Sequence, residues 1–169
     1  MSGLPRRKGF TLIELIVMLA VVVILTLASI PLFTSVIQYF RITSAAEQLY
    51  SALQNARTEA VKRNANVYMN VSAGSNWCYG FNTGSTCNCA TAGSCNLGSY
   101  SATAANLLTL SATGLSSNSI FFTGMHGGVS SAATFTFTQY GSTPLITTSI
   151  SMLGSISVCS TGVNGYTAC

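Results

Sequence analysis

Apolar residues fill the early part of the chain and then follow a helical period. The run from Leu15 to Ile30 is almost entirely apolar and is long enough for a helix to span a bilayer core. Farther on, apolar residues recur every three or four positions, which predicts the buried stripe of an amphipathic helix. This stripe comprises Ile42, Ala45, Ala46, Leu49, Leu53, Ala56 and Ala60. The patterns join without a break and predict one helix from Phe10 to Arg63, capped by Asn64.

Period-two alternation begins after Asn64 and predicts β-strands. Alternating stretches lie at Val67–Val71, Trp77–Phe81, Ile120–Phe122, Phe135–Phe137 and Ile156–Val158, with shorter candidates at Leu107–Leu110, Leu145–Ile146 and Ile150–Met152. Glycine and asparagine clusters separate them, which indicates an antiparallel meander of about six to eight strands. Residues 84–103 are rich in small and polar residues and predict a long loop. We therefore expect an α+β fold, with the long N-terminal helix packed on an antiparallel β domain.

Two features modify the predicted helix. Pro31 lacks a backbone N–H and clashes with the preceding turn, so we expect a kink or a loosened turn over residues 27–31. Glu59 precedes Lys62 and Arg63 by three and four residues, a spacing that stabilises the last turns through ion pairs. The alternative for the first apolar run is an ordinary secretory signal cleaved near Ala28. The amphipathic pattern continues past that point, which favours a continuous helix.

Charged residues are confined to the first part of the chain. All the Lys, Arg, Asp and Glu residues lie at or before Arg63, and there is no Asp. Arg6, Arg7 and Lys8 carry three units of the net charge of +4, and they place the N-terminus on the cytoplasmic side of a membrane. Paired-carboxylate catalysis, a Ser-His-Asp triad and a carboxylate calcium site all lack necessary residues. His126 is expected to be a loop histidine, so we predict neither an enzyme nor a cofactor.

Cysteines lie only beyond the apolar run. The six residues are Cys78, Cys87, Cys89, Cys95, Cys159 and Cys169. An even number in an exported domain predicts a disulfide framework. A zinc ion held by Cys87, Cys89 and Cys95 is the alternative. Their spacing is irregular and the only histidine is distant in the sequence, so no metal site is expected. A pair between Cys159 and Cys169 is the first choice, and the other four would then staple the loop from Trp77 to Leu97.

Glu14 is the one acidic residue inside the apolar run. A carboxylate near a bilayer core costs about 2.5–3.5 kcal/mol, so it usually has a partner. If the chain is cut between Gly9 and Phe10, the new amine of Phe10 lies one helical turn from Glu14. In a bundle of such helices, Glu14 of one chain could neutralise the amine of its neighbour and set the register between subunits. The alternative is a carboxylate that snorkels to the cytoplasmic interface.

A family resemblance rests on these N-terminal residues. Gly9-Phe10-Thr11-Leu12-Ile13-Glu14-Leu15, with the basic leader before it and Pro31 after it, resembles the class III signal of type IV prepilins and type II secretion pseudopilins. Residues 49–64 and 67–71 resemble FimT/FimU minor pilins and the GspH-like pseudopilin H. The resemblance implies that a prepilin peptidase cleaves after Gly9 and methylates Phe10, and that Glu14 and Pro31 serve filament assembly.

The expected organisation follows from both lines of reasoning. We expect a leader peptide over residues 1–9, a transmembrane and assembly helix over 10–36, the amphipathic half of the helix over 37–64, and a disulfide-stapled, pilin-like β domain over 65–169. The resemblance implies an inner-membrane protein of a bacterium whose C-terminal domain lies in the periplasm before the chain enters a pilus or pseudopilus, which can be extracellular.

The resemblance also implies the function and the partners. The first hypothesis is a minor type IV pilin that primes the pilus or lies near its tip, with other pilin subunits, the prepilin peptidase and the inner membrane as partners. A type II secretion pseudopilin H is the second hypothesis, and a DNA-capturing FimT-like pilin is the third. Some FimT-like pilins bind DNA through C-terminal arginines, whereas residues 162–165 here contain none, so direct DNA binding is not expected.

Overall fold

The computed structural model describes residues 9–102, 107–139 and 142–169, with residues 28–35 and 142–144 described by their backbone alone. Its contacts divide the chain into two compact units, Met1–Gln38 and Tyr39–Cys169. Helix α1 (Leu12–Arg63) begins in the first unit and ends in the second. It starts two residues later than predicted because Thr11 caps it. The backbone is helical throughout residues 27–31, and the predicted kink or loosened turn at Pro31 stays a prediction.

The end of α1 is the one predicted from the sequence. Asn64 has a φ of 49°, in the left-handed region that asparagine tolerates. Its N–H donates to the carbonyl of Val61 at 3.2 Å, and the N–H of Ala65 donates to the carbonyl of Ala60 at 3.1 Å. These two bonds form a Schellman motif, which satisfies carbonyls that a helix end leaves unpaired. The Asn64 cap is therefore confirmed.

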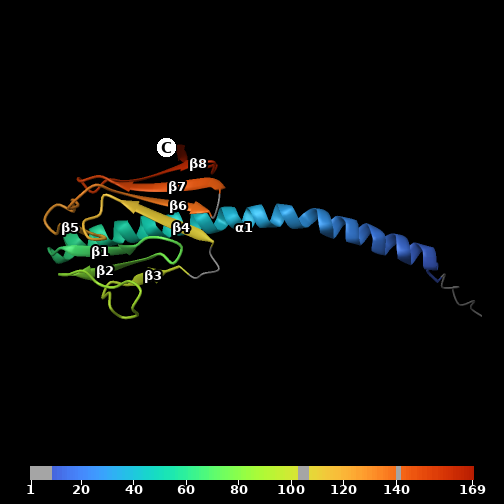
Figure 1. Cartoon of the computed structure of the whole chain (residues 1–169), viewed down its shortest axis with the longest axis horizontal. Coiled ribbons are helices and arrows are strands. Elements are labelled where there is room, and N and C mark those ends of the chain that lie inside the picture. Colours follow the sequence, from blue (N-terminus) through green and yellow to red (C-terminus); the bar gives the residue numbers. More distant parts are fainter. Residues whose placement is uncertain (1–8, 103–106, 140–141) are drawn as a thin grey trace, which may run out of the picture. The chain divides into compact units, whose positions relative to one another are not determined.

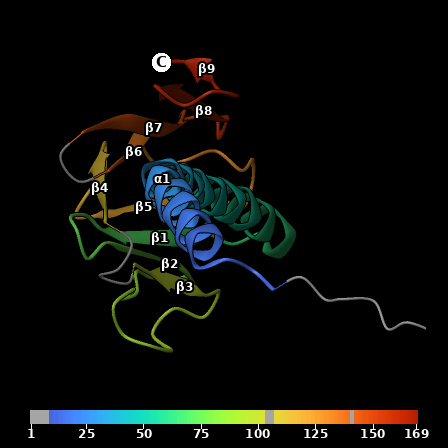
Figure 2. The ribbon, with the colours of Figure 1, turned by 90° about the vertical axis from the view of Figure 1, so that its right-hand side faces the viewer.

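The second unit contains two β-sheets (Figure 1). The strands in the described part are β1 (Val67–Ser72), β2 (Cys78–Thr83), β3 (Ser99–Ser101), β4 (Leu108–Thr113), β5 (Ser119–Phe122), β6 (Ala133–Gln139), β7 (Ser142–Ile150), β8 (Ile156–Thr161) and β9 (Thr167–Ala168). Sheet A has the order β3-β2-β1-β5, and sheet B has the order β4-β6-β7-β8-β9. Figure 2 looks along the helix and shows strands of sheet A below it and β6 to β9 above it.

The C-terminal half of α1 and the two sheets share one hydrophobic core. Every residue of the predicted apolar stripe is buried, with exposed fractions of 5% or less. The stripe meets large side chains that are also fully buried, among them Trp77, Phe122, Phe135 and Phe137. Each such side chain gains about 1.5–3 kcal/mol on leaving water. The α+β fold, with a helix packed on antiparallel sheets, is confirmed.

Three details of the strand prediction are wrong. Residues 84–103 are not all loop, because Ser99–Ser101 forms the edge strand β3 beside β2. The candidates at 145–146 and 150–152 merge into β7, and Met152 lies beyond it in a turn where it is 62% exposed. Strand β9 pairs with β8 in parallel, so the domain is not wholly antiparallel. A three-residue strand and a two-residue strand are too short to show an alternating pattern.

The outer face of sheet B carries hydroxyl groups rather than charges. On β6, the half-buried residues Thr134 and Thr136 alternate with buried apolar residues. The hydroxyls of Thr136 and Thr147 lie 3.2 Å apart across β6 and β7, and those of Ser149 and Ser157 lie 2.8 Å apart across β7 and β8. Cross-strand hydroxyl pairs of this kind stabilise a sheet modestly. This face is neutral because all the Lys, Arg, Asp and Glu residues precede β1.

Candidate functional site

The start of α1 combines the predicted assembly residues with a helix cap. The N–H of Glu14 donates to the side-chain oxygen of Thr11 at 3.4 Å and to its carbonyl at 3.1 Å. Thr11 is thus the N-cap residue and Glu14 occupies the third helical position, the Thr-x-x-Glu spacing of a capping box. The Thr11 cap was not predicted, although the Thr-x-x-Glu spacing is visible in the sequence.

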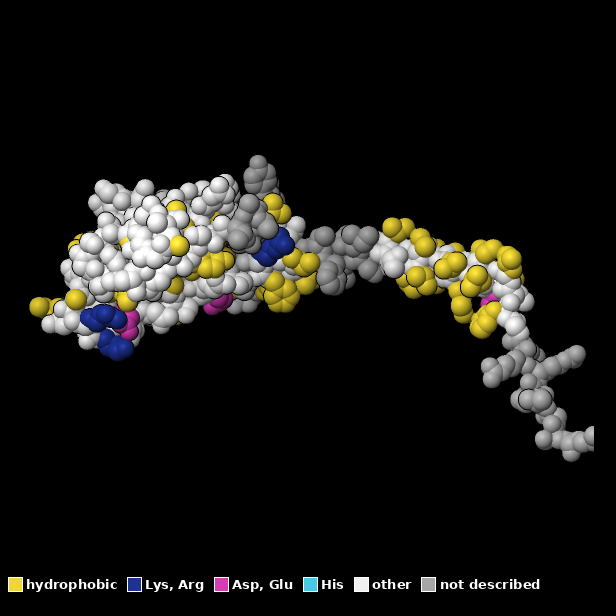
Figure 3. Space-filling view, turned by 90° about the horizontal axis from the view of Figure 1, so that it is seen from below, with side chains coloured by type: hydrophobic (Ala, Val, Ile, Leu, Met, Phe, Trp, Pro, Cys, Tyr) yellow, Lys and Arg dark blue, Asp and Glu magenta, His cyan; other side chains and the backbone are white. Residues whose placement is uncertain are grey.

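The apolar side chains at the start of α1 are open to the surroundings. All those from Thr11 to Leu27 are exposed, and Phe10 is 74% and Leu12 is 76% exposed. Figure 3 shows the exposed hydrophobic atoms gathered on this helical segment. A contiguous apolar surface of this extent marks an interaction site, because soluble monomers rarely leave one open.

The expected transmembrane segment, residues 10–36, includes residues 28–35, whose side chains lie outside the described part. Among the residues that the structure describes, no helix is both long enough and apolar enough to cross a membrane.

Disulfide bonds, which the sequence predicted, join all six cysteines: Cys78 to Cys89, Cys87 to Cys95, and Cys159 to Cys169. The first two bonds fold residues 84–98 against β2. Gly80 permits this approach, because a Cβ at that position would overlap the Sγ of Cys95. With these thiols in disulfides, the described part holds no group of three His, Cys, Asp or Glu side chains able to bind a metal.

The last residues of the chain are tied to α1. The hydroxyl of Tyr39 donates to the carbonyl of Asn164 at 2.9 Å, and the hydroxyl of Tyr166 donates to the carboxylate of Glu47 at 2.5 Å. Burial, followed by this bond to Glu47, raises the pKa of Tyr166. Val163 is buried beside these contacts. The segment expected to match the DNA-binding motif therefore lies against the helix.

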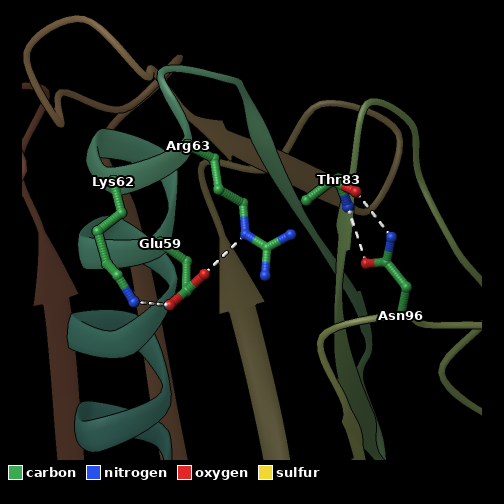
Figure 4. A network of polar contacts seen from close by, with 5 residues as sticks. All are labelled: Glu59, Lys62, Arg63, Thr83 and Asn96. Carbon is green, nitrogen blue, oxygen red and sulfur yellow. Dashed lines mark hydrogen bonds and ion pairs between the residues drawn. The ribbon is translucent and has the colours of Figure 1, made fainter.

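Three cationic side chains in the second half of α1 have partners within the protein. Lys62 Nζ and Arg63 Nε contact the Glu59 carboxylate at 3.1 and 2.7 Å, so the predicted ion pairs are confirmed (Figure 4). Hydrogen bonds from Arg63 and then Lys62 lower the pKa of Glu59. Arg57 Nε donates to the carbonyl of Gly127 at 3.1 Å. His126, expected to be a loop histidine, is exposed in the loop after β5.

A cavity of about 540 Å³ opens beside the disulfide loop, and we call it the α1–β3 cavity. Ala52, Ala56 and Glu59 of α1 line one side. Tyr79 of β2 and Tyr100 of β3 line the other. Strand β3 is the edge strand of sheet A and carries Tyr100 into the cavity wall. The cavity was not predicted, since Tyr100 lay in a predicted loop.

This chain is similar to known protein families. A family model described as type II transport protein GspH matches residues 45–154, which is more than half of the chain. The chain belongs to the GspH family. A second model, the prokaryotic N-terminal methylation motif, matches residues 4–30. No curated protein is similar enough to this GspH-family chain to count as a match.

Two crystal structures of the type IV minor pilin FimU from Pseudomonas aeruginosa strain PAO1 are similar to this GspH-family chain. The structure in space group P65 is 26% identical with a TM-score of 0.52, and the match covers 69% of this chain and 91% of that one. The structure in space group P21 is 27% identical with a TM-score of 0.53, covering 69% and 87%. The chain is thus a member of the type IV pilin and pseudopilin superfamily, in its FimU/GspH-like branch.

Proposed function

We propose that this GspH-family chain is a minor type IV pilin, a structural subunit that helps to prime a pilus and lies near its tip. The observation that carries the proposal is the exposed apolar start of α1, which lies within the range matched by the methylation-motif model. Before assembly, the inner membrane would cover this helix. After assembly, the equivalent helices of other pilin subunits would cover it, and the β domain would face the periplasm or the cell exterior.

The proposed processing uses the residues singled out in the sequence. A prepilin peptidase would remove residues 1–9 and methylate the new amine of Phe10. Glu14 would then pair with the amine of a neighbouring subunit in the filament. Its location in the first turn of α1 supports this role, because a carboxylate there is also favoured by the helix dipole. Mass analysis of the mature chain tests the cleavage and the methyl group directly.

Three variants separate the charge of Glu14 from any effect of its side chain on the start of α1. Glu14→Gln retains a side chain that suits the third position of a capping box but removes the charge, whereas Glu14→Ala removes both. Glu59→Ala is the matched control on the same helix. We expect both Glu14 variants to enter the membrane yet to be lost from sheared filaments, and the control to be recruited normally. Recruitment of Glu14→Gln at the level of the unmodified chain would refute the pairing role.

A type II secretion pseudopilus is the second candidate, because the matching family model is that of GspH. The two candidates share the same N-terminal chemistry, so the phenotype of a deletion separates them. Loss of twitching with intact secretion supports a pilus, and loss of secretion with intact twitching supports a pseudopilus.

Direct DNA binding is not part of the proposal. Lys62 and Arg63 pair with Glu59, and Arg57 donates to a backbone carbonyl, so these cations are already engaged. DNA binding needs cations that can contact phosphates and so release the counterions condensed on the DNA. We expect a gel shift with residues 39–169 at low salt to show little binding, and a strong salt-dependent shift would contradict this expectation.

A further inference from the structure

The α1–β3 cavity has a rigid aromatic wall. The ring of Tyr100 stacks on that of Tyr79, with centroids 5.6 Å apart and planes at 19°. Trp77 stacks on the same Tyr100 ring at 5.3 Å and 25°. Tyr100 itself is only half-buried, so part of it remains open to the cavity that it lines. Two stacked neighbours hold this ring in place before any ligand arrives.

A phenol hydroxyl in the same wall is accessible from the cavity. Tyr79 lines the cavity and as a residue is only 4% exposed, but its hydroxyl is not one of the buried unpartnered polar atoms of the described part, which are Trp77 Nε1 and Thr148 Oγ1. Burial raises the pKa of Tyr79, and the nearby Tyr100 raises it further, so the phenol stays neutral and can both donate and accept. A hydroxyl of a ligand in the cavity could therefore form a hydrogen bond with it in either direction.

The opposite rim is polar but carries no strong charge. Arg63 Nε donates to the Glu59 carboxylate, so the two opposite charges offset each other. Figure 4 shows the Arg63 guanidinium between Glu59 and the strand that carries Thr83, with Asn96 bound to Thr83 on the far side. Asn55 adds an amide to the helix side of the cavity. The rim thus carries both donors and acceptors, and its one acidic and one basic residue pair with each other, so no net charge selects an ionic ligand.

We propose that the α1–β3 cavity binds a short neutral saccharide. A sugar ring has an apolar C–H face that packs on Tyr100 and hydroxyl groups that both donate and accept, as the Tyr79 hydroxyl, Asn55 and Glu59 require. The volume lies in the range of about 300–1,000 Å³ that is usual for small-ligand sites. The inference goes beyond filament assembly and does not depend on it, because every lining residue belongs to the second unit.

The second unit alone is suitable for the test. Its core cluster runs from Ile42 to Val163, so residues 39–169 contain that core and all three disulfides. The probes are lactose, maltose, cellobiose and N,N′-diacetylchitobiose, followed by saturation-transfer NMR and calorimetric titration. We expect at least one probe to bind with millimolar or tighter affinity and to receive magnetisation from the ring protons of Tyr100.

Matched variants assign the binding to the cavity. Tyr100→Leu removes the aromatic face, and affinity should fall about three- to tenfold. Tyr68→Leu is the control, because Tyr68 is also half-buried and lies against Phe121 outside the cavity. The proposal is overturned if no probe binds, or if Tyr68→Leu weakens binding as much as Tyr100→Leu. Binding of N-acetyl-tryptophanamide in place of every sugar would also overturn it, since the cavity would then be a peptide anchor site.

Discussion

A crowded glycine gives the sharpest prediction about stability. Gly154 lies in the turn after β7 with a φ of 78°, and its N–H donates to the carbonyl of Ser151 at 2.8 Å. A Cβ at this position would overlap the carbonyl oxygen of Gly127 and would lie 3.0 Å from Arg57 Nε. The substitution Gly154→Ala therefore combines two costs: a strained backbone and a displaced hydrogen bond between Arg57 and Gly127.

Gly93 separates these two costs. Its φ of 76° is nearly the same, but a Cβ there would have no atom within 4 Å. Left-handed backbone costs an alanine about 1–2 kcal/mol, which is the expected destabilisation for Gly93→Ala. At Gly154, weakening the bond from the charged Arg57 adds about 1.5–3 kcal/mol. We therefore expect Gly154→Ala to lose about 2.5–5 kcal/mol of a total that is typically about 5–15 kcal/mol.

Urea unfolding of residues 39–169 with the disulfides intact measures the difference. Trp77 is the single tryptophan and is fully buried, so its fluorescence reports the loss of the core. With a slope of about 2 kcal/mol per molar, the midpoint should fall by about 1–2.5 M for Gly154→Ala and by about 0.5–1 M for Gly93→Ala. Equal shifts for the two variants would show that the crowding around Arg57 contributes nothing.

Further predictions concern the terminal disulfide, the phenol and the surface ion pairs. Replacing both Cys159 and Cys169 by Ser should cost about 2.8 kcal/mol by loop entropy, visible as a lower urea midpoint. Because burial raises the pKa of Tyr79, the unfolded chain loses this proton first, and stability should fall as the pH rises above about 10. Tyr79→Phe should reduce that alkaline loss in pH-dependent unfolding. Glu59→Gln should change the midpoint little, since exposed pairs contribute about 0–1 kcal/mol.

The sequence was sufficient for α1 and for the core. The apolar stripe from Ile42 to Ala60 repeats with the helical period and lies on one face of α1. Each of its residues was therefore correctly predicted to be buried without knowledge of the side chains that cover it. The Glu59 ion pairs and the Asn64 cap are equally local. The Thr11 cap is local as well, so it could have been predicted from the Thr-x-x-Glu spacing alone.

Contacts between distant residues were not available in that way. Tyr100 becomes part of a strand only because it pairs with Tyr79, and β3 is too short to show its own periodicity. Arg57 resembles any exposed helical arginine in the sequence, yet it donates to Gly127 and lies near Gly154, which belong to two separate loops. The α1–β3 cavity likewise depends on the pairing of β3 with β2. Patterns along the chain carry no information about these distances.

The paired hydroxyls of sheet B have a consequence for how the folded unit behaves in solution. Thr136 and Thr147 bond to each other, as do Ser149 and Ser157, so water meets a face without formal charge. Electrostatic repulsion between two such faces is weak, and colloidal dispersion must rely on hydration alone. Concentrated salt that competes for water should therefore bring these molecules together at low protein concentration, whereas a change of buffer pH near neutrality should scarcely alter their solubility.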